Sequence, residues 1–146
     1  MKKLPKFSER LTELMFEDNN ITTDKLGEKL GLRGSSIRIW RSGRSNPSLQ
    51  YAILLAEYFN CSLDYLLGRI DNDITFTPQE LLPFHISLTT ILKEKNLSWY
   101  KVVGDTNISK TSMQAWRKGS VPLLPILIEL ADYLDVSIDY LIGRER

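Results

Sequence analysis

Histidine and cysteine are almost missing from this chain of 146 residues, which has one of each, His85 and Cys61. A chain so poor in both cannot assemble an ordinary zinc site, a disulfide framework or a Cys–His catalytic pair. No acid–base pair, activated nucleophile or glycine-rich phosphate loop stands out either. We therefore expect no enzymatic activity, no catalytic residue, no metal and no cofactor.

Long hydrophobic runs are missing as well. The most apolar run covers residues 123–128 and contains Pro125, far short of the roughly 20 residues that a membrane span requires. The N-terminal sequence MKKLPKFSERL has the basic residues of a signal peptide but no apolar core behind them. We expect a cytoplasmic protein with no membrane partner, and the lone thiol fits a reducing compartment.

Net charge is also small, +1, but the charges are segregated along the chain. Residues 33–56 and 106–128 contain no aspartate or glutamate. Their basic residues are Arg33, Arg38, Arg41, Arg44, Lys110, Arg117 and Lys118. A nearly neutral protein that carries two basic segments has the charge pattern of a nucleic-acid-binding protein.

What the sequence does contain is an internal repeat. Residues 55–69 read LAEYFNCSLDYLLGR and residues 130–144 read LADYLDVSIDYLIGR, with nine of 15 positions identical. A Trp-Arg pair and a glycine upstream recur at a spacing of 76 residues. Each copy is long enough for a small domain. The repeat predicts one domain over residues 1–69, a linker over 70–82 and a second domain over 83–146.

The predicted linker contains a pattern that is typical of a helix start. Thr77, Pro78 and Glu80 supply a cap, a proline at the first helical position and a glutamate three residues after the cap. Pro83 would interrupt such a helix. We therefore expect one short helical turn within the linker.

Each copy is predicted to fold as five short helices, and no strand pattern competes with them. In the first copy, Thr22, Ser48 and Ser62 stand at N-cap positions, and Gly31 and Gly43 stand where helices end. The second copy follows the same plan, so the sequence predicts an all-α protein of two tandem domains.

Two positions set the second copy apart. Asn107 stands where Gly31 stands, and asparagine is the non-glycine residue that best tolerates positive φ, so we expect it to take that conformation. Val103 stands where Gly27 stands. A small residue there would let the second and third helices approach closely, so Val103 predicts a shifted packing.

Two short helices joined by a tight turn form a helix-turn-helix, whose second helix can enter the major groove. We expect these recognition helices over about residues 34–42 and 110–118. At 100° per residue, Ile37, Trp40, Met113 and Trp116 face inward. The outward residues are Ser35, Arg38, Ile39, Ser42, Thr111, Gln114, Ala115 and Lys118. Arginine can pair with guanine, glutamine with adenine, and Ile39 or Ala115 can contact a thymine methyl group.

Both copies resemble the Xre/Cro-type helix-turn-helix family of phage and bacterial repressors. The resemblance is carried by LGLRGSSIRIWRSGRSNPS with LLAEYFNCSLDYLLGR, and by NISKTSMQAWRKGSVP with ELADYLDVSIDYLIGR. It implies five-helix, lambda-repressor-like domains that bind a double-stranded DNA operator, usually as a dimer on a palindrome.

The resemblance also implies further contacts with the DNA backbone. The first residue of the second helix, which binds a phosphate in relatives, is Thr23 in one copy and Trp99 in the other, and the loop after the recognition helix maps to residues 44–46 and to Ser120. Trp99 can offer an indole N–H or packing. With Tyr100 it forms either a partner surface or packing on the linker. The candidate DNA-binding residues are Thr23, Arg33, Ser35, Arg38, Ile39, Arg41, Ser42, Arg44, Asn46, Ser109, Lys110, Thr111, Gln114, Ala115, Arg117 and Lys118.

These patterns favour a sequence-specific DNA-binding transcriptional regulator, a repressor that reads two unequal half-sites. Residues 1–70 carry a net charge of +3 and residues 71–146 a net charge of −2. The alternative is therefore that only the N-terminal repeat binds DNA. The C-terminal repeat would then be a dimerisation or protein-docking module, antitoxin-like or adaptor-like, with a second copy or another protein as its partner.

Overall fold

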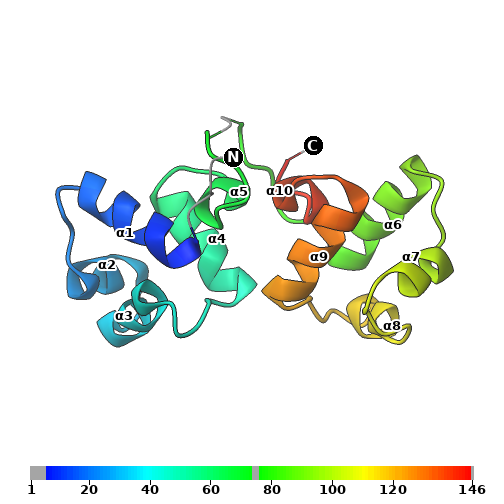
Figure 1. The fold of residues 1–146 in the computed structure, drawn as a ribbon, viewed down its shortest axis with the longest axis horizontal. Helices are drawn as coiled ribbons and strands as arrows, with labels where there is room; N and C mark the ends of the chain where they lie inside the picture. Colours follow the sequence, from blue (N-terminus) through cyan, green and yellow to red (C-terminus); the bar gives the residue numbers. More distant parts are fainter. Residues whose placement is uncertain (1–5, 74–75, 146) are drawn as a thin grey trace. The chain divides into compact units, whose positions relative to one another are not determined.

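The computed structural model describes residues 6–73 and 76–145, which are helical with no strand among them (Figure 1). The chain divides into a first unit, Met1–Thr75, and a second unit, Phe76–Arg146. The helices of the first unit are α1 (Phe7–Glu17), α2 (Thr23–Leu30), α3 (Gly34–Ser42), α4 (Leu49–Tyr58) and α5 (Leu63–Leu66). Those of the second are α6 (Phe84–Glu94), α7 (Trp99–Asp105), α8 (Ser112–Arg117), α9 (Leu124–Leu134) and α10 (Ile138–Leu141). The predicted all-α fold is confirmed.

The capping residues predicted for the first unit are confirmed. The side chains of Thr22, Ser48 and Ser62 each accept a hydrogen bond from a backbone N–H in the first turn of α2, α4 and α5. Gly31 and Gly43 end α2 and α3 with φ of 71° and 79°, a left-handed conformation that glycine adopts without steric cost. Local sequence therefore sets the helix boundaries in this unit.

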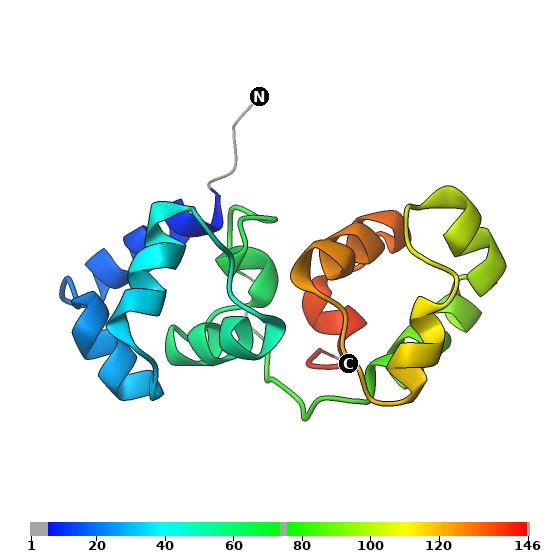
Figure 2. The same ribbon diagram turned by 90° about the horizontal axis from the view of Figure 1, so that it is seen from below.

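The core of the first unit lies where α1 packs against α3 and α5, with α2 against α3 and α4 against α5 (Figure 2). Burial of large apolar side chains is the main stabilising contribution in a domain of this size. The fully buried large side chains are Leu11, Met15, Leu26, Ile37, Leu55, Leu63 and Leu66. This packing fixes α3 by its inner side and leaves its other side in solvent.

The second unit repeats this scheme with α6 packed against α8 and α10, and α9 against α10. Its fully buried large side chains are Leu88, Leu127, Leu130, Leu134 and Ile138. No described helix in either unit has the length and apolar character that crossing a membrane demands.

The segment before α6 differs from the prediction. The short helical turn expected at Thr77–Glu80 is wrong, because residues 76–83 contain no helix. The backbone N–H of Gln79 instead donates to the carbonyl oxygen of Arg144 at 2.7 Å, and the Arg144 guanidinium lies 5.7 Å from the centre of the Phe76 ring. Contacts with the end of the chain thus override a local helix-start pattern. Residues 74 and 75 of the expected linker lie outside the described residues.

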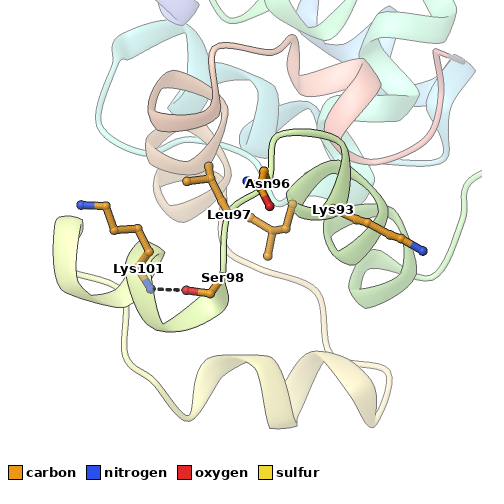
Figure 3. Close-up of a pocket in the computed structure, with 6 residues that line it drawn as sticks. Lys93, Asn96, Leu97, Ser98 and Lys101 are labelled. Atoms are coloured by element: carbon orange, nitrogen blue, oxygen red, sulfur yellow. Dashed lines mark hydrogen bonds between the residues drawn. The ribbon is translucent and has the colours of Figure 1, made fainter.

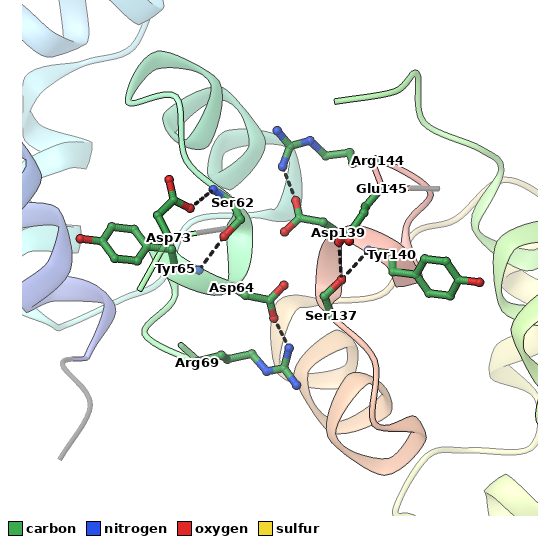
Figure 4. Close-up of polar contacts among 10 residues, drawn as sticks. All are labelled: Ser62, Asp64, Tyr65, Arg69, Asp73, Ser137, Asp139, Tyr140, Arg144 and Glu145. Carbon is green, nitrogen blue, oxygen red and sulfur yellow. Dashed lines mark hydrogen bonds and ion pairs between the residues drawn. The ribbon is translucent and has the colours of Figure 1, made fainter. Parts of the chain in front are cut away.

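The most similar segment of the repeat closes each unit. Asp64 pairs with Arg69 in the first unit, and Asp139 pairs with Arg144 in the second (Figure 4). In both units the backbone N–H of the arginine also donates to the carbonyl oxygen of the aspartate, at 2.8 Å. Asp64, Asp139 and Arg144 are buried. The repeated D-Y-L-[L/I]-G-R sequence is therefore a structural motif, and it lies apart from the recognition helices in sequence.

Candidate nucleic-acid interface

Helix α3 has the two faces that its periodicity predicts, and its bounds match the expected ones. Ile37 and Trp40 are buried, with 0% and 6% of their surface exposed. Ser35, Arg38, Ile39 and Ser42 are exposed. The predicted inward and outward assignments are confirmed for this helix, which presents a polar and basic surface with one aliphatic side chain.

Helices α2 and α3 lie in direct backbone contact. A Cβ atom on Gly27 would lie 2.6 Å from the carbonyl oxygen of Leu32 and 3.0 Å from the backbone nitrogen of Gly34. A Cβ atom on Gly34 would collide with the carboxylate of Asp24. Glycine at both positions is therefore what lets the start of α3 rest on α2, and this contact fixes the angle at which α3 is presented.

Four exposed arginines lie along α3 and beside its two ends. Arg33 is the N-cap, Arg38 and Arg41 lie on the helix, and Arg44 lies in the loop after it. The Arg38 Nη1 atom donates to Thr23 Oγ1 at 2.9 Å and to Asp24 Oδ1 at 3.1 Å. The Arg41 Nε atom lies 3.4 Å from its acceptor, a hydroxyl on α1. Sequence reasoning missed Asp24, because an analysis of α3 alone cannot find an acceptor on the neighbouring helix.

In the second unit the recognition helix is shorter than expected. Helix α8 covers Ser112–Arg117, so the predicted bounds of 110–118 are wrong at both ends. Lys110 lies in a turn before the helix, Thr111 is its N-cap, and Lys118 is its C-cap. The predicted faces are nevertheless confirmed. Met113 and Trp116 are buried, and the exposed residues are Thr111, Gln114, Ala115 and Lys118.

Trp99, which stands where Thr23 stands in the first unit, packs within the second unit. Its ring packs edge-on against Trp116, with ring centres 5.6 Å apart, and its indole N–H donates to the carbonyl oxygen of Lys110 at 3.1 Å. With Val103 in place of glycine, α7 and α8 also lie less closely together than α2 and α3, so the shifted packing is confirmed. Trp99 is half-buried and its indole N–H bonds within the unit, whereas Tyr100 is 88% exposed, so the exposed aromatic pair is wrong.

The end of α7 contains a further correction. Asn107 does not adopt the predicted positive φ. Helix α7 ends at Asp105, and its C-cap Thr106 is extended, with φ of −127° and ψ of 175°. The backbone N–H of Asn107 donates to Glu129 Oε1 at 3.1 Å. A chain that leaves α7 in an extended conformation needs no left-handed residue there, so the analogy with Gly31 fails.

Every predicted DNA-contacting residue is exposed except Thr23, which is half-buried beneath Arg38. They form one group in each unit. The loop after α3 continues its group with Arg44, Ser45 and Asn46, whereas the loop after α8 contains the exposed apolar residues Val121 and Leu123. The first unit is therefore the more basic of the two along its recognition helix and loop.

A hollow of about 540 Å³ lies beside the turn between α6 and α7 (Figure 3). Its lining includes Lys93 and Lys101, whose side chains point away from one another in Figure 3. Lys101 pairs with Asp105 at 3.2 Å, and Asp105 also accepts a hydrogen bond from Tyr133. These two donors lower the pKa of Asp105, and the carboxylate raises the pKa of Tyr133. The two lysines do not converge on a ligand position in this hollow. The exposed faces of α3 and α8 therefore remain the candidate site.

Comparison with known proteins gives the class of this chain. Residues 15–66 match the helix-turn-helix family model, and residues 87–145 match the model described as a Cro/C1-type HTH DNA-binding domain. Together the two matches cover more than half of the chain, which thus contains two helix-turn-helix domains in tandem, the second of the Cro/C1 type, as the sequence motifs predict.

One curated relative can be placed beside it. The chain is 30% identical over 66 residues to YobD of Bacillus subtilis (strain 168), described as an uncharacterized HTH-type transcriptional regulator. The match covers 45% of this chain and 58% of the relative, so the similarity spans little more than half of that protein. No solved structure matches the chain.

Proposed function

We propose that the protein is a sequence-specific DNA-binding transcriptional regulator that acts as a repressor. The observation that carries this proposal is the exposed side of α3, where four arginines follow the helix and its loop in a stretch of 24 residues without an acid. Arginine side chains can neutralise phosphates, and one of them, Arg38, can pair with guanine from the centre of the helix. The description of the Bacillus relative supports the regulatory role.

We further propose that both units read DNA, with the first unit dominating affinity. Gln114 and Arg117 lie exposed on α8, with Lys118 exposed at its C-cap, which supports reading of an adenine and contact with phosphates. Unequal charge supports a weaker second half-site, as does the loop after α8, which has Ser120 where Arg44 stands and also exposes Val121 and Leu123. The second candidate function, a dimerisation or docking module in the second unit, is favoured by the same exposed apolar loop.

The first test is the dependence of DNA affinity on salt. The seven basic residues of the two segments include several that we expect to neutralise phosphates, so log affinity should fall linearly with log salt concentration with a slope of several units. Binding-site selection from random DNA with the full chain supplies the duplex, and fluorescence anisotropy measures its affinity. Arg38→Ala should weaken specific binding by about 1–3 kcal/mol with little change in melting temperature. A flat salt response would contradict DNA binding and favour a protein partner.

The second test asks whether the second unit contacts DNA. Gln114→Ala should relax the preference at one base pair of the weaker half-site and cost about 1–3 kcal/mol there. Lys118→Ala should weaken binding evenly across sequences and reduce the salt slope by about one unit. Repeating the site selection with each variant measures both effects. If neither variant changes the selected sequence or the affinity, the docking role of the second unit replaces the reading role.

A further inference from the structure

We propose that Asp24 is a specificity-determining residue of the first unit: it holds Arg38 ready for one base and reduces the attraction of Arg38 to phosphates in general. The inference rests on the proposed function, in which Arg38 reads a base from α3. Asp24 lies on α2, not on the recognition helix, and its carboxylate is not one of the predicted DNA contacts.

The geometry places Asp24 and Thr23 as a fixed acceptor pair for Arg38. Both residues lie in the first turn of α2, and the Arg38 Nη1 atom donates to Thr23 Oγ1 at 2.9 Å and to Asp24 Oδ1 at 3.1 Å. The Asp24 carboxylate occupies the space that a Cβ on Gly34 would take. The glycine at the start of α3 thus makes room for the carboxylate, and the backbone contact between the helices sets its position.

The hydrogen bonds to α2 leave one edge of the guanidinium for DNA. A guanidinium has five N–H donors in a planar fork, and the bonds of Arg38 to Thr23 and Asp24 both use Nη1. The edge formed by Nε and Nη2 can then donate in parallel to N7 and O6 of a guanine. An arginine that is already oriented loses less side-chain freedom when it binds, so the bonds to α2 favour the paired state.

The specificity ratio is the affinity for the operator divided by the affinity for other DNA. The charge of Asp24 acts on the affinity for other DNA. The side chains of Arg38 and Asp24 are 55% and 79% exposed, so their pairing contributes little to folding. In front of a DNA backbone the same pair presents a nearly cancelled charge. Sequence-independent affinity comes largely from neutralised phosphates, so Asp24 should weaken binding to non-operator DNA while the guanine contact is retained.

The second unit lacks this arrangement at every corresponding position. Tyr100 stands where Asp24 stands, Gln114 where Arg38 stands, and Lys110 where Gly34 stands. Gln114 is neutral and needs no carboxylate beside it, and Lys110 has the Cβ atom that Gly34 lacks. Asp24, Arg38 and Gly34 are thus all replaced in the second unit, which supports the three residues acting together.

The test compares Asp24→Asn with Glu28→Gln in the full chain. Both variants remove one acid from α2, but Glu28 is exposed and its side chain has no described contact with Arg38. Anisotropy with the selected duplex and with a scrambled duplex gives the specificity ratio. We expect Asp24→Asn to tighten binding to the scrambled duplex and to lower the ratio by about five- to tenfold, with Glu28→Gln changing the ratio by less than about twofold.

Base preference provides the second readout. Arg38→Ala, selected separately, identifies the base pair that Arg38 reads, and Asp24→Asn should weaken preference at that same base pair. Equal effects of Asp24→Asn and Glu28→Gln on ratio and base preference would overturn the inference. If Arg38→Ala itself leaves every base preference unchanged, the failure is that of the proposed reading by Arg38, and the inference falls with it.

A melting curve guards against a purely structural effect. If Asp24→Asn unfolds the first unit, Thr23→Val takes its place, because it removes the other acceptor of Arg38 without a change of charge. We then expect a partial loss of preference at the base pair that Arg38 reads, larger than any effect at other positions. Full retention of that preference in folded Thr23→Val would overturn the positioning role.

Discussion

Replacing Trp40 by alanine should lower the free energy of unfolding of the first unit by about 3–5 kcal/mol. Trp40 is 6% exposed, and its ring lies 5.9 Å from that of Tyr51, so it joins α3 to α4. Removing the ring leaves a cavity under the recognition helix that a small domain cannot refill. Urea denaturation of the full chain, followed by circular dichroism, measures the loss as an earlier transition of one unit.

Ile39→Ala is the matched control, since Ile39 is the next residue before Trp40 on the same helix but is 38% exposed. It should change the unfolding free energy by less than about 1 kcal/mol, because surface positions contribute little to stability. A Trp40→Ala variant that unfolds like the wild type and loses only DNA binding would contradict the inward orientation of the helix.

Exchanging Gly27 for valine, the residue of the second unit at this position, should destabilise the first unit by about 1–3 kcal/mol or more. A Cβ there meets the carbonyl oxygen of Leu32 at 2.6 Å, and next the backbone nitrogen of Gly34 at 3.0 Å. Neither atom belongs to a flexible side chain, so α2 and α3 must separate. DNA affinity should fall further than stability alone explains, because α3 changes its angle. Thermal melting and anisotropy, measured on the same sample, separate the two losses.

Gly104→Ala should change the stability in the opposite direction in the same experiment. Gly104 lies within α7, and a Cβ added to it meets no atom within 4 Å. Alanine in a helix is favoured over glycine by about 0.5–1 kcal/mol, so this variant should raise the melting temperature of the second unit. Destabilisation by both variants would mean that glycine matters here for some reason other than the approach of two helices.

Local signals were enough to predict most of the first unit. Caps such as Thr22 and Ser62 and end residues such as Gly31 and Gly43 act within a few residues of themselves, so a sequence can be scanned for them directly. The inner and outer faces of α3 follow from periodicity alone. The fold class and the exposed side of each recognition helix were predictable for these reasons.

Two of the wrong predictions involve contacts between separate elements, which a local pattern does not show. The pattern at residues 77–80 fails because Gln79 bonds to Arg144, and the start of α8 shifts where the indole of Trp99 binds the carbonyl of Lys110. The contact between Asp24 and Arg38 was missed for the same reason. A helical wheel describes one helix at a time, so contacts between helices lie outside what it can predict.

The repeated segment at residues 64–69 and 139–144 affects how the DNA preference of each unit can change. Its aspartate–arginine pair and its glycine lie in the segment where the two units are most alike, while the exposed residues of α3 and α8 differ at almost every position. The residues that complete the fold and the residues that meet a partner are thus two separate sets. A duplicated unit can therefore exchange one binding preference for another by surface substitutions alone, with no change in the residues that stabilise its fold.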